Sequence, residues 1–291
     1  MYQLLISVEE LQARLGKSDL LILDVRHDLN SHEAGRLAYE EGHIPGARFL
    51  DHETQLSAPR TGQNGRHPLP AMADFKELMR GLGLRPDTQV VSYDGSGGMF
   101  ATHLWWMLRW IGHDKVAVLD GGWPAWLASG GEVETTVHAS PALQGPAEAN
   151  GRIETASAAM PIVSSDEVLE NISRPTFTVI DARAENRYRG EVEPMDPVAG
   201  HIPGALNRPH TRNLSDEGRF KPADQLRSEF AELLAGKAPS DIVHQCGSGI
   251  TATHNLFAME LAGMSGSRLY PGSWSEWCSD PARPVARGDA A

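Results

Sequence analysis

Cys246 is the residue of this chain with the most evident chemistry, because it opens a glycine-rich turn. The apolar pair Ile242 and Val243 leads into the cysteine through His244 and Gln245, which predicts a strand over residues 241–245. The turn consists of Gly247, Ser248, Gly249, Ile250 and Thr251. Apolar residues then recur at helical spacing over residues 252–261. Cys246 is therefore expected between the end of a strand and the N-terminus of a helix.

That position suits a reactive thiol. Only the thiolate form of cysteine is a nucleophile, and a free thiol ionises at about pH 8.5. Backbone N–H groups at the N-terminus of a helix favour a nearby anion by about 0.3–1 kcal/mol. Glycines allow several N–H groups to point inward. The turn is therefore predicted to hold a thiolate, a persulfide or an oxyanion. The alternative is a small buried apolar residue beside an ordinary turn.

An internal duplication favours the functional interpretation. Four short patterns occur twice in the same order, three of them at a spacing of 157 or 158 residues and the fourth at about 150. Such a period is too long for a solenoid repeat and indicates a duplicated domain. The pairs are residues 7–10 with 164–167, 21–26 with 178–183, 42–47 with 200–205, and 119–123 with 269–274. The first pair also fits a helix-capping box. Asp94 stands in the first half where Cys246 stands in the second, so only the second half has a nucleophile.

The elements that must position the cysteine follow an α/β pattern. Short β-branched runs alternate with helix-like segments, which predicts parallel sheets covered by helices on both faces. The predicted strands are Leu20–Val25, Val90–Tyr93, Val116–Leu119, Phe177–Asp181 and Asp241–Gln245. A stretch rich in Ala, Pro and Gly separates the halves. We therefore expect a first domain over 1–137, a linker over 138–159 and a catalytic domain over 160–291.

Composition excludes several functional classes. The chain has 291 residues and a formal net charge of −12, so nucleic acid and anionic membranes are not expected partners. Two cysteines are too few for a disulfide scaffold, and no apolar run is long enough for a membrane span. A cytoplasmic protein is predicted. No Cys or His pair has zinc-ligand spacing with enough partners, so no metal is expected.

Taken together, the paired Asp-x-Arg and Gly-His-Ile-Pro-Gly-Ala segments, the loop at 246–251 and Gly-Ser-Trp at 272–274 resemble the tandem-domain rhodaneses over nearly the whole chain. The loop itself resembles that of the 3-mercaptopyruvate sulfurtransferases. Thiosulfate-preferring members usually carry basic residues after the cysteine, and those positions are uncharged here. The resemblance implies two tandem rhodanese-like α/β domains, of which the second is catalytic.

The resemblance also implies a ping-pong sulfur transfer. The Cys246 thiolate takes sulfur from a small anionic donor, 3-mercaptopyruvate in preference to thiosulfate, and pyruvate or sulfite leaves. Cyanide, a thiol or thioredoxin then removes the outer sulfur of the persulfide. No cofactor is needed, because the persulfide itself carries the sulfur.

By resemblance, Arg187 binds the anionic end of the donor, as a guanidinium can bond a carboxylate bidentately. The mercaptopyruvate enzymes have a second arginine after a Pro-Glu-Pro segment. Here residues 193–197 read Glu-Pro-Met-Asp-Pro, and that arginine is missing. Arg189 is a candidate substitute.

A proton relay is the second implied feature. Ser248 matches the family's loop serine, and His67 matches a histidine that the first domain is expected to contribute. The acid of the relay is either Asp51 or Glu53. Cys278 is expected to be a spectator, and no protective disulfide with Cys246 is predicted.

Two alternatives remain open at the level of sequence. A phosphatase or arsenate reductase would need an arginine six residues after the cysteine, where this chain has Ala252. A non-catalytic sulfur carrier or sensor would keep Cys246 but would not turn over a donor.

Overall fold

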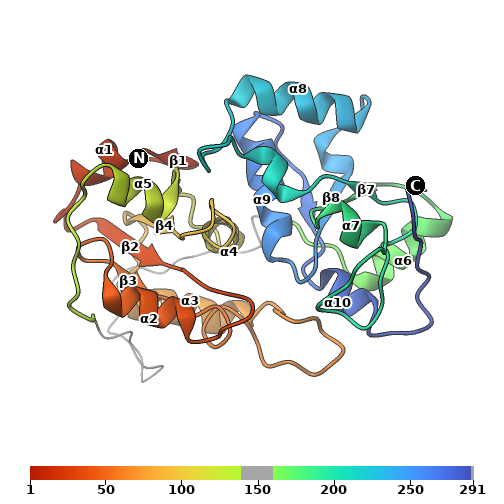
Figure 1. The fold of residues 1–291 in the computed structure, drawn as a ribbon, viewed down its shortest axis with the longest axis horizontal. Coiled ribbons are helices and arrows are strands. Elements are labelled where there is room, and N and C mark those ends of the chain that lie inside the picture. Colours follow the sequence, from red (N-terminus) through yellow and green to blue (C-terminus); the bar gives the residue numbers. More distant parts are fainter. Residues whose placement is uncertain (139–159, 290–291) are drawn as a thin grey trace. The chain divides into compact units, whose positions relative to one another are not determined.

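The computed structural model describes residues 1–138 and 160–289 of the chain (Figure 1). The described residues form two compact units, which are treated separately below. The first unit contains Met1–Ala58, the chain from Leu69 to His138, and Glu217–Arg219. The second contains Pro59–Pro68, Met160–Asp216 and the chain from Phe220 onward. The predicted boundaries at 137/138 and 159/160 stay a prediction, since most of the predicted linker, residues 139–159, lies outside the described residues.

In the first unit, the described residues form a five-stranded parallel sheet with the order β1-β5-β4-β2-β3. The strands are β1 (Leu5–Ile6), β2 (Leu20–Asp24), β3 (Arg48–Phe49), β4 (Gln89–Tyr93) and β5 (Val116–Leu119). The helices are α1 (Val8–Gln12), α2 (Ala34–Glu41), α3 (Met72–Gly81), α4 (Ala101–Trp110) and α5 (Gly122–Ala128).

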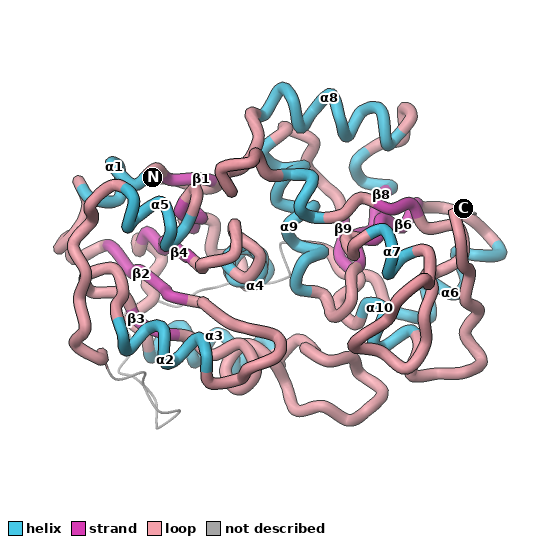
Figure 2. The backbone as a smooth tube through the Cα atoms, viewed as in Figure 1, coloured by secondary structure: helices cyan, strands magenta, loops and turns pink. Residues whose placement is uncertain are grey.

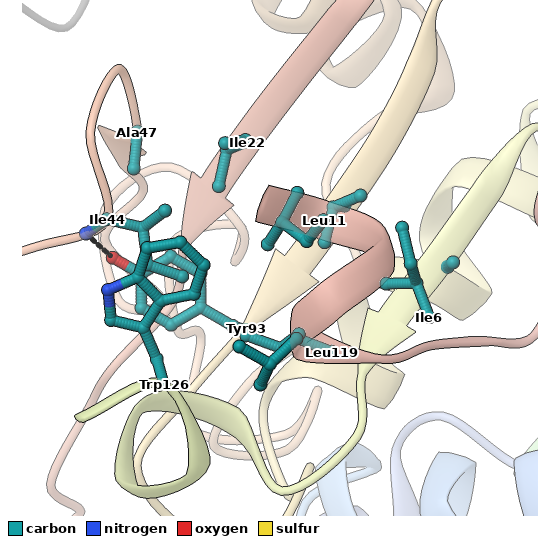
Figure 3. Packing of buried hydrophobic residues seen from close by; sticks show 11 residues of the cluster. Ile6, Leu11, Ile22, Ile44, Ala47, Tyr93, Leu119 and Trp126 are labelled. Atoms are coloured by element: carbon teal, nitrogen blue, oxygen red, sulfur yellow. Dashed lines mark hydrogen bonds between the residues drawn. The ribbon is translucent and has the colours of Figure 1, made fainter. Parts of the chain in front are cut away.

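Both faces of this sheet are covered. Figure 3 shows the core on one face, where Leu11 of α1 and Trp126 of α5 pack on strand residues such as Ile22 and Leu119. Helix α4 covers the other face, and Ser92 of β4 donates a hydrogen bond to the Ala101 carbonyl there. Burial on both faces explains why these strands are near-continuous apolar runs.

The second unit repeats this arrangement with the parallel strand order β7-β6-β8-β9. Strands β6, β8 and β9 are labelled in Figure 2. Its strands are β6 (Thr178–Asp181), β7 (Leu206–Asn207), β8 (Ile242–Gln245) and β9 (Arg268–Leu269). Its helices are α6 (Ser165–Ser173), α7 (Glu185–Tyr188), α8 (Ala223–Leu234), α9 (Ile250–Leu261) and α10 (Ser273–Trp277), with 3₁₀ turns at His210–Asn213 and Pro239–Asp241. Every strand predicted from the sequence is confirmed to within one residue at each end.

The repeated sequence patterns form the same structures in both units. Ser7 with Glu10 and Ser164 with Glu167 make complete capping boxes at the starts of α1 and α6, as predicted. The chain before α6 continues the parallel pairing through a bridge from Ile162 to Leu269, the counterpart of β1 beside β5. The α/β fold with two units of parallel sheet flanked by helices is therefore confirmed.

The Asp-x-Arg pattern makes a buried ion pair in each unit. Arg183 contacts Asp181 at 2.7 Å and also donates to the Gly200 carbonyl at 2.7 Å. Arg26 likewise binds Asp24 at 2.6 Å and the Gly42 carbonyl at 2.7 Å. The arginine thus ties the end of the central strand to the Gly-His-Ile-Pro-Gly turn.

None of the described helices combines the length and apolar character that a membrane span requires.

His244 of β8 should make the fold sensitive to acid. Burial first, and then the positive charge of Arg208, lower the pKa of His244 to about 3. Below pH 6.5 the unfolded chain therefore binds a proton that the native chain does not, so stability falls as the pH falls from 6.5 toward 3. We expect His244→Leu to remove a slope of up to about 1.4 kcal/mol per pH unit from the free energy of unfolding. Urea denaturation at pH 8, 6, 5 and 4 measures this, and equal slopes for both proteins would contradict it.

Candidate active site: the cysteine loop

Cys246 lies directly after β8, and α9 begins four residues later at Ile250. Its side chain is buried, and the Gly249 N–H donates to its Sγ at 3.2 Å. The loop therefore wraps the sulfur with a backbone donor close to the start of α9. This is the environment expected for a nucleophilic thiol, because N–H groups and the helix dipole both favour a negative sulfur.

The turn before α10 fixes the loop from the other side. The Cys246 N–H donates to Ser273 Oγ at 3.1 Å. The Trp274 N–H donates to the Cys246 carbonyl at 3.0 Å, and the Ser275 N–H donates to the Gly247 carbonyl at 2.9 Å. Ser273 has a φ of +54°, a left-handed conformation that places its hydroxyl under the loop. The Gly-Ser-Trp pattern of the sequence is thus part of the scaffold of the nucleophile.

Gly249 is required by geometry. Its φ is +89°, and a Cβ at this position would lie 2.4 Å from the Pro271 carbonyl oxygen. A side chain would therefore displace the backbone that presents the N–H to sulfur.

The predicted contact between Ser248 and His67 is present, within the second unit. His67 Nδ1 lies 2.8 Å from Ser248 Oγ, and both side chains are buried. The segment Pro59–Pro68 reaches the loop because the Arg66 N–H donates to Ser275 Oγ at 3.0 Å. The assignment of His67 as a catalytic residue stays a prediction, but its ring and the loop serine are in hydrogen-bond contact.

Arg187 lies beside the loop in a network of acids. Its Nη2 contacts Glu193 Oε1 at 2.6 Å and Asp196 Oδ2 at 3.4 Å, and its Nε contacts Glu193 Oε2 at 3.2 Å. A Cβ added to Gly247 would meet both Nη atoms of Arg187 at 3.7 Å. The guanidinium therefore lies beside the backbone that follows Cys246, and its role in binding the donor stays a prediction.

Arg66 is the residue at the site that sequence reasoning missed. Its Nη1 forms an ion pair with Asp196, and its Nη2 lies 2.7 Å from the position that a Cβ on Gly247 would occupy. Its place directly before His67 was the one signal in the sequence that could have indicated that Arg66 lies at the site. The interaction spans 130 residues between Arg66 and Asp196, so no local pattern reveals it.

Arg189 has different surroundings from Arg187. Its guanidinium pairs with Glu191 at 2.7 Å and lies 3.9 Å from Glu185 and from Asp289. All three acids are more than half exposed, so these are surface ion pairs of small energetic weight. The prediction that Arg189 grips the donor remains untested.

The two candidate acids belong to the first unit. Asp51 Oδ1 accepts hydrogen bonds from the Glu53 and Thr54 N–H groups, both at 2.8 Å, and so caps a local turn. Glu53 lies 3.8 Å from His27 Nε2. Which of the two acids serves His67 stays a prediction.

Cys278 is a buried thiol in the core of the second unit. Burial, and then the charge of Asp196, raise the pKa of Cys278 to about 11. It is therefore a poor nucleophile near neutral pH, in keeping with the spectator role expected for it.

One group of possible metal ligands occurs in the first unit. His43, Glu134 and His138 place ligand atoms within 4.8 Å of one another. His43 Nδ1 contacts the Tyr39 carbonyl at 2.8 Å, and His138 Nε2 contacts Glu134 at 3.1 Å. Each of these three side chains thus has a hydrogen-bond partner in the protein. The expectation that the protein binds no metal stays a prediction.

Comparison with known proteins agrees with this geometry. The model of the rhodanese-like domain matches residues 7–129 and again residues 164–280. A Pseudomonas aeruginosa protein named "Probable 3-mercaptopyruvate sulfurtransferase" is 47% identical over 287 residues, covering 98% of each chain. A Mycobacterium tuberculosis protein with a provisional name of thiosulfate sulfurtransferase, SseB, is 38% identical over 99% of this chain and 98% of its own.

A solved structure extends the likeness to three dimensions. The 3-mercaptopyruvate sulfurtransferase from Leishmania major matches with a TM-score of 0.82 and 29% identity, over 97% of this chain and 76% of that one. The chain therefore belongs to the rhodanese family. Within that family it is an enzyme of the sulfurtransferase class, which works on a small-molecule sulfur donor and an acceptor.

Replacing Gly249 tests the geometry of the loop. Gly249→Ala combines a left-handed φ with a backbone clash, and we expect the free energy of unfolding to fall by about 2 kcal/mol or more. Gly236→Ala is the matched control, because Gly236 has a φ of +87° with nothing within 4 Å of an added Cβ. Urea denaturation compares the two. Equal losses would mean that the loop relaxes around the new methyl group.

Proposed function

We propose that this sulfurtransferase moves sulfur from 3-mercaptopyruvate, through a persulfide on Cys246, to cyanide, a thiol or thioredoxin. The observation that carries the proposal is the position of the Cys246 sulfur at the end of β8, with a backbone N–H on it and a guanidinium beside the next residue. The assignment to a cytoplasmic location belongs to the same proposal.

The first half-reaction forms the persulfide. The Cys246 thiolate attacks the donor sulfur, and the carbon–sulfur bond of mercaptopyruvate breaks. Its electron pair stays on carbon as the enolate of pyruvate, which takes up a proton. Arg187 holds the carboxylate, and the Ser248–His67 hydrogen bond provides a route for the proton from the donor thiol. With thiosulfate the sulfur–sulfur bond breaks instead, and sulfite leaves with the electron pair.

The second half-reaction regenerates the enzyme. The acceptor attacks the outer sulfur of the persulfide, and the sulfur–sulfur bond electrons return to Cys246 as a thiolate. No redox partner is needed, because each step exchanges one bond to sulfur for another.

The first unit supports the idea that such a loop holds an anion. Asp94 follows β4 as Cys246 follows β8, and its carboxylate accepts four backbone hydrogen bonds. The donors are the N–H groups of Ser96, Gly98, Phe100 and Ala101, at 2.7–3.0 Å. A thiolate or persulfide in the second unit would carry the same charge in the same kind of turn.

Thiosulfate is the second candidate donor. The lack of an arginine between Gly190 and Gly200, where the mercaptopyruvate enzymes have one, favours this alternative, as does the name of the mycobacterial relative. The non-catalytic sulfur carrier would form one persulfide per chain without turnover.

The donor test compares kcat/KM for 3-mercaptopyruvate and thiosulfate on one preparation. We expect a ratio above about ten in favour of mercaptopyruvate, which corresponds to about 1.4 kcal/mol of transition-state preference. A ratio in favour of thiosulfate would make this a thiosulfate sulfurtransferase. Cys246→Ser should abolish turnover, and activity that survives in this variant would contradict the mechanism.

Removing the loop hydroxyl tests the proton route. Ser248→Ala should lower kcat with 3-mercaptopyruvate by about 100-fold. It should change kcat with thiosulfate much less, because that donor has no thiol proton and its leaving group needs none. Ser265→Ala, an exposed serine that contacts Glu260, is the control. An equal loss with both donors would mean that Ser248 acts on the loop itself and not on a proton.

A further inference from the structure

Arg187 alone would bind the carboxylate of the donor weakly. The chain from Gly190 to Gly200 contains no arginine, and its acids Glu193 and Asp196 both contact Arg187. These acids consume part of the donor capacity of the guanidinium and offset its charge. A carboxylate would therefore meet a weaker positive field than one arginine by itself provides.

Arg66 restores that charge from a distant part of the sequence. The acid Asp196 holds both arginines, with Arg66 Nη1 on Oδ1 and Arg187 Nη2 on Oδ2. The two guanidiniums therefore converge on one carboxylate, which fixes their orientation. The Arg66 N–H bond to Ser275 and the contact between His67 and Ser248 anchor the backbone of the segment against the same loop.

The remaining donors of both arginines lie at the cysteine loop. Arg66 Nη2 and Arg187 Nη1 have no hydrogen-bond partner within the described residues, and both lie near the position that a Cβ on Gly247 would occupy, at 2.7 and 3.7 Å. Both side chains keep 18% of their surface exposed. Two N–H-bearing nitrogens from separate guanidiniums thus lie beside Gly247, the residue that follows Cys246.

We propose that Arg66 is the second substrate-binding arginine of this enzyme and that it pairs with Arg187 to hold the carboxylate of the donor. This inference rests on the proposed function. Gly247 is part of the same arrangement, because a side chain there would occupy the place of the Arg66 head group. Asp196, in the segment that lacks the expected arginine, acts as a positioning residue that recruits Arg66.

A purely structural role for Arg66 is the competing explanation. Asp196 is largely buried, burial raises its pKa, and Arg66 opposes that rise by favouring the carboxylate. Arg66 would then stabilise the fold without contacting the donor. The two explanations differ in their effect on binding, because a structural role predicts no selective change in the affinity for carboxylates.

The test is Arg66→Gln, with Arg174→Gln as the matched control. Arg174 is an exposed arginine of the same unit, so its replacement changes the net charge equally. We expect KM for 3-mercaptopyruvate to rise about 10- to 100-fold in Arg66→Gln with kcat nearly unchanged, since a charge-assisted hydrogen bond to substrate is lost. The inhibition constant of pyruvate, which has the carboxylate but no thiol, should rise in parallel. The rate at which cyanide discharges the preformed persulfide should not change.

Arg66→Gln leaves Asp196 without its partner, so the double variant Arg66→Gln/Asp196→Asn guards against a failure to fold. It removes both charges and should show the same rise in KM and in the pyruvate inhibition constant. Gly247→Ala removes no arginine from the chain but should raise KM as well, because its methyl group would displace the Arg66 head group.

The possible results distinguish a failure of the role of Arg66 from a failure of the proposed function. Suppose that the wild-type enzyme turns over but that folded Arg66→Gln, or the double variant, keeps the wild-type KM and pyruvate inhibition constant. This result would overturn the role of Arg66 and leave the proposed function standing. A fall in kcat alone, or a loss of thermal stability alone, would assign Arg66 to the structural role and would also overturn the inference. Absence of wild-type turnover, or activity without Cys246, would instead refute the proposed function.

Discussion

The buried ion pair between Asp181 and Arg183 is the constraint on which the second unit depends. Both side chains are almost fully buried, and burial opposes the charge of Arg183 while Asp181 and then Glu193 outweigh it and raise its pKa. Removing one partner of such a pair costs about 3–5 kcal/mol, because the other charge is left uncompensated. Arg183 also contacts Glu193, which binds Arg187. The buried charges at the end of β6 are therefore connected through Glu193 to Arg187 beside the cysteine loop.

The turn after β4 in the first unit corresponds to the turn after β8 in the second, but a different side chain lies in each. In the first unit the turn after β4 is satisfied permanently by the Asp94 carboxylate, which occupies its backbone donors. In the second unit the sulfur of Cys246 takes the corresponding place after β8, and the Gly249 N–H donates a hydrogen bond to it. The Asp94 carboxylate already binds the backbone donors of the first turn, whereas under the proposed function the thiol of the second turn accepts sulfur. A single side chain on a shared backbone plan would then account for the difference in chemistry.

Acids in the site both limit and organise its positive charge. Glu193 and Asp196 neutralise part of the field of the arginines, but they also hold planar guanidiniums in fixed orientations. A fixed guanidinium loses less side-chain entropy when an anion binds than a free one would. Selectivity for a donor would then come from the geometry of the remaining N–H groups more than from net charge.

The sequence by itself determined the duplication, the strands and the position of Cys246 directly after one of them. These features depend on local patterns: apolar runs for β8, helical spacing for α9, and glycines around Cys246. The resemblance had pointed to His67, but its contact with Ser248 and the place of Arg66 beside the loop were decided only by the tertiary structure. Arg66 and His67 stand some 180 residues before Ser248, and their segment lies with the second unit although it precedes most of the first in sequence. Contacts at that separation depend on how the chain returns through space, which no local periodicity encodes.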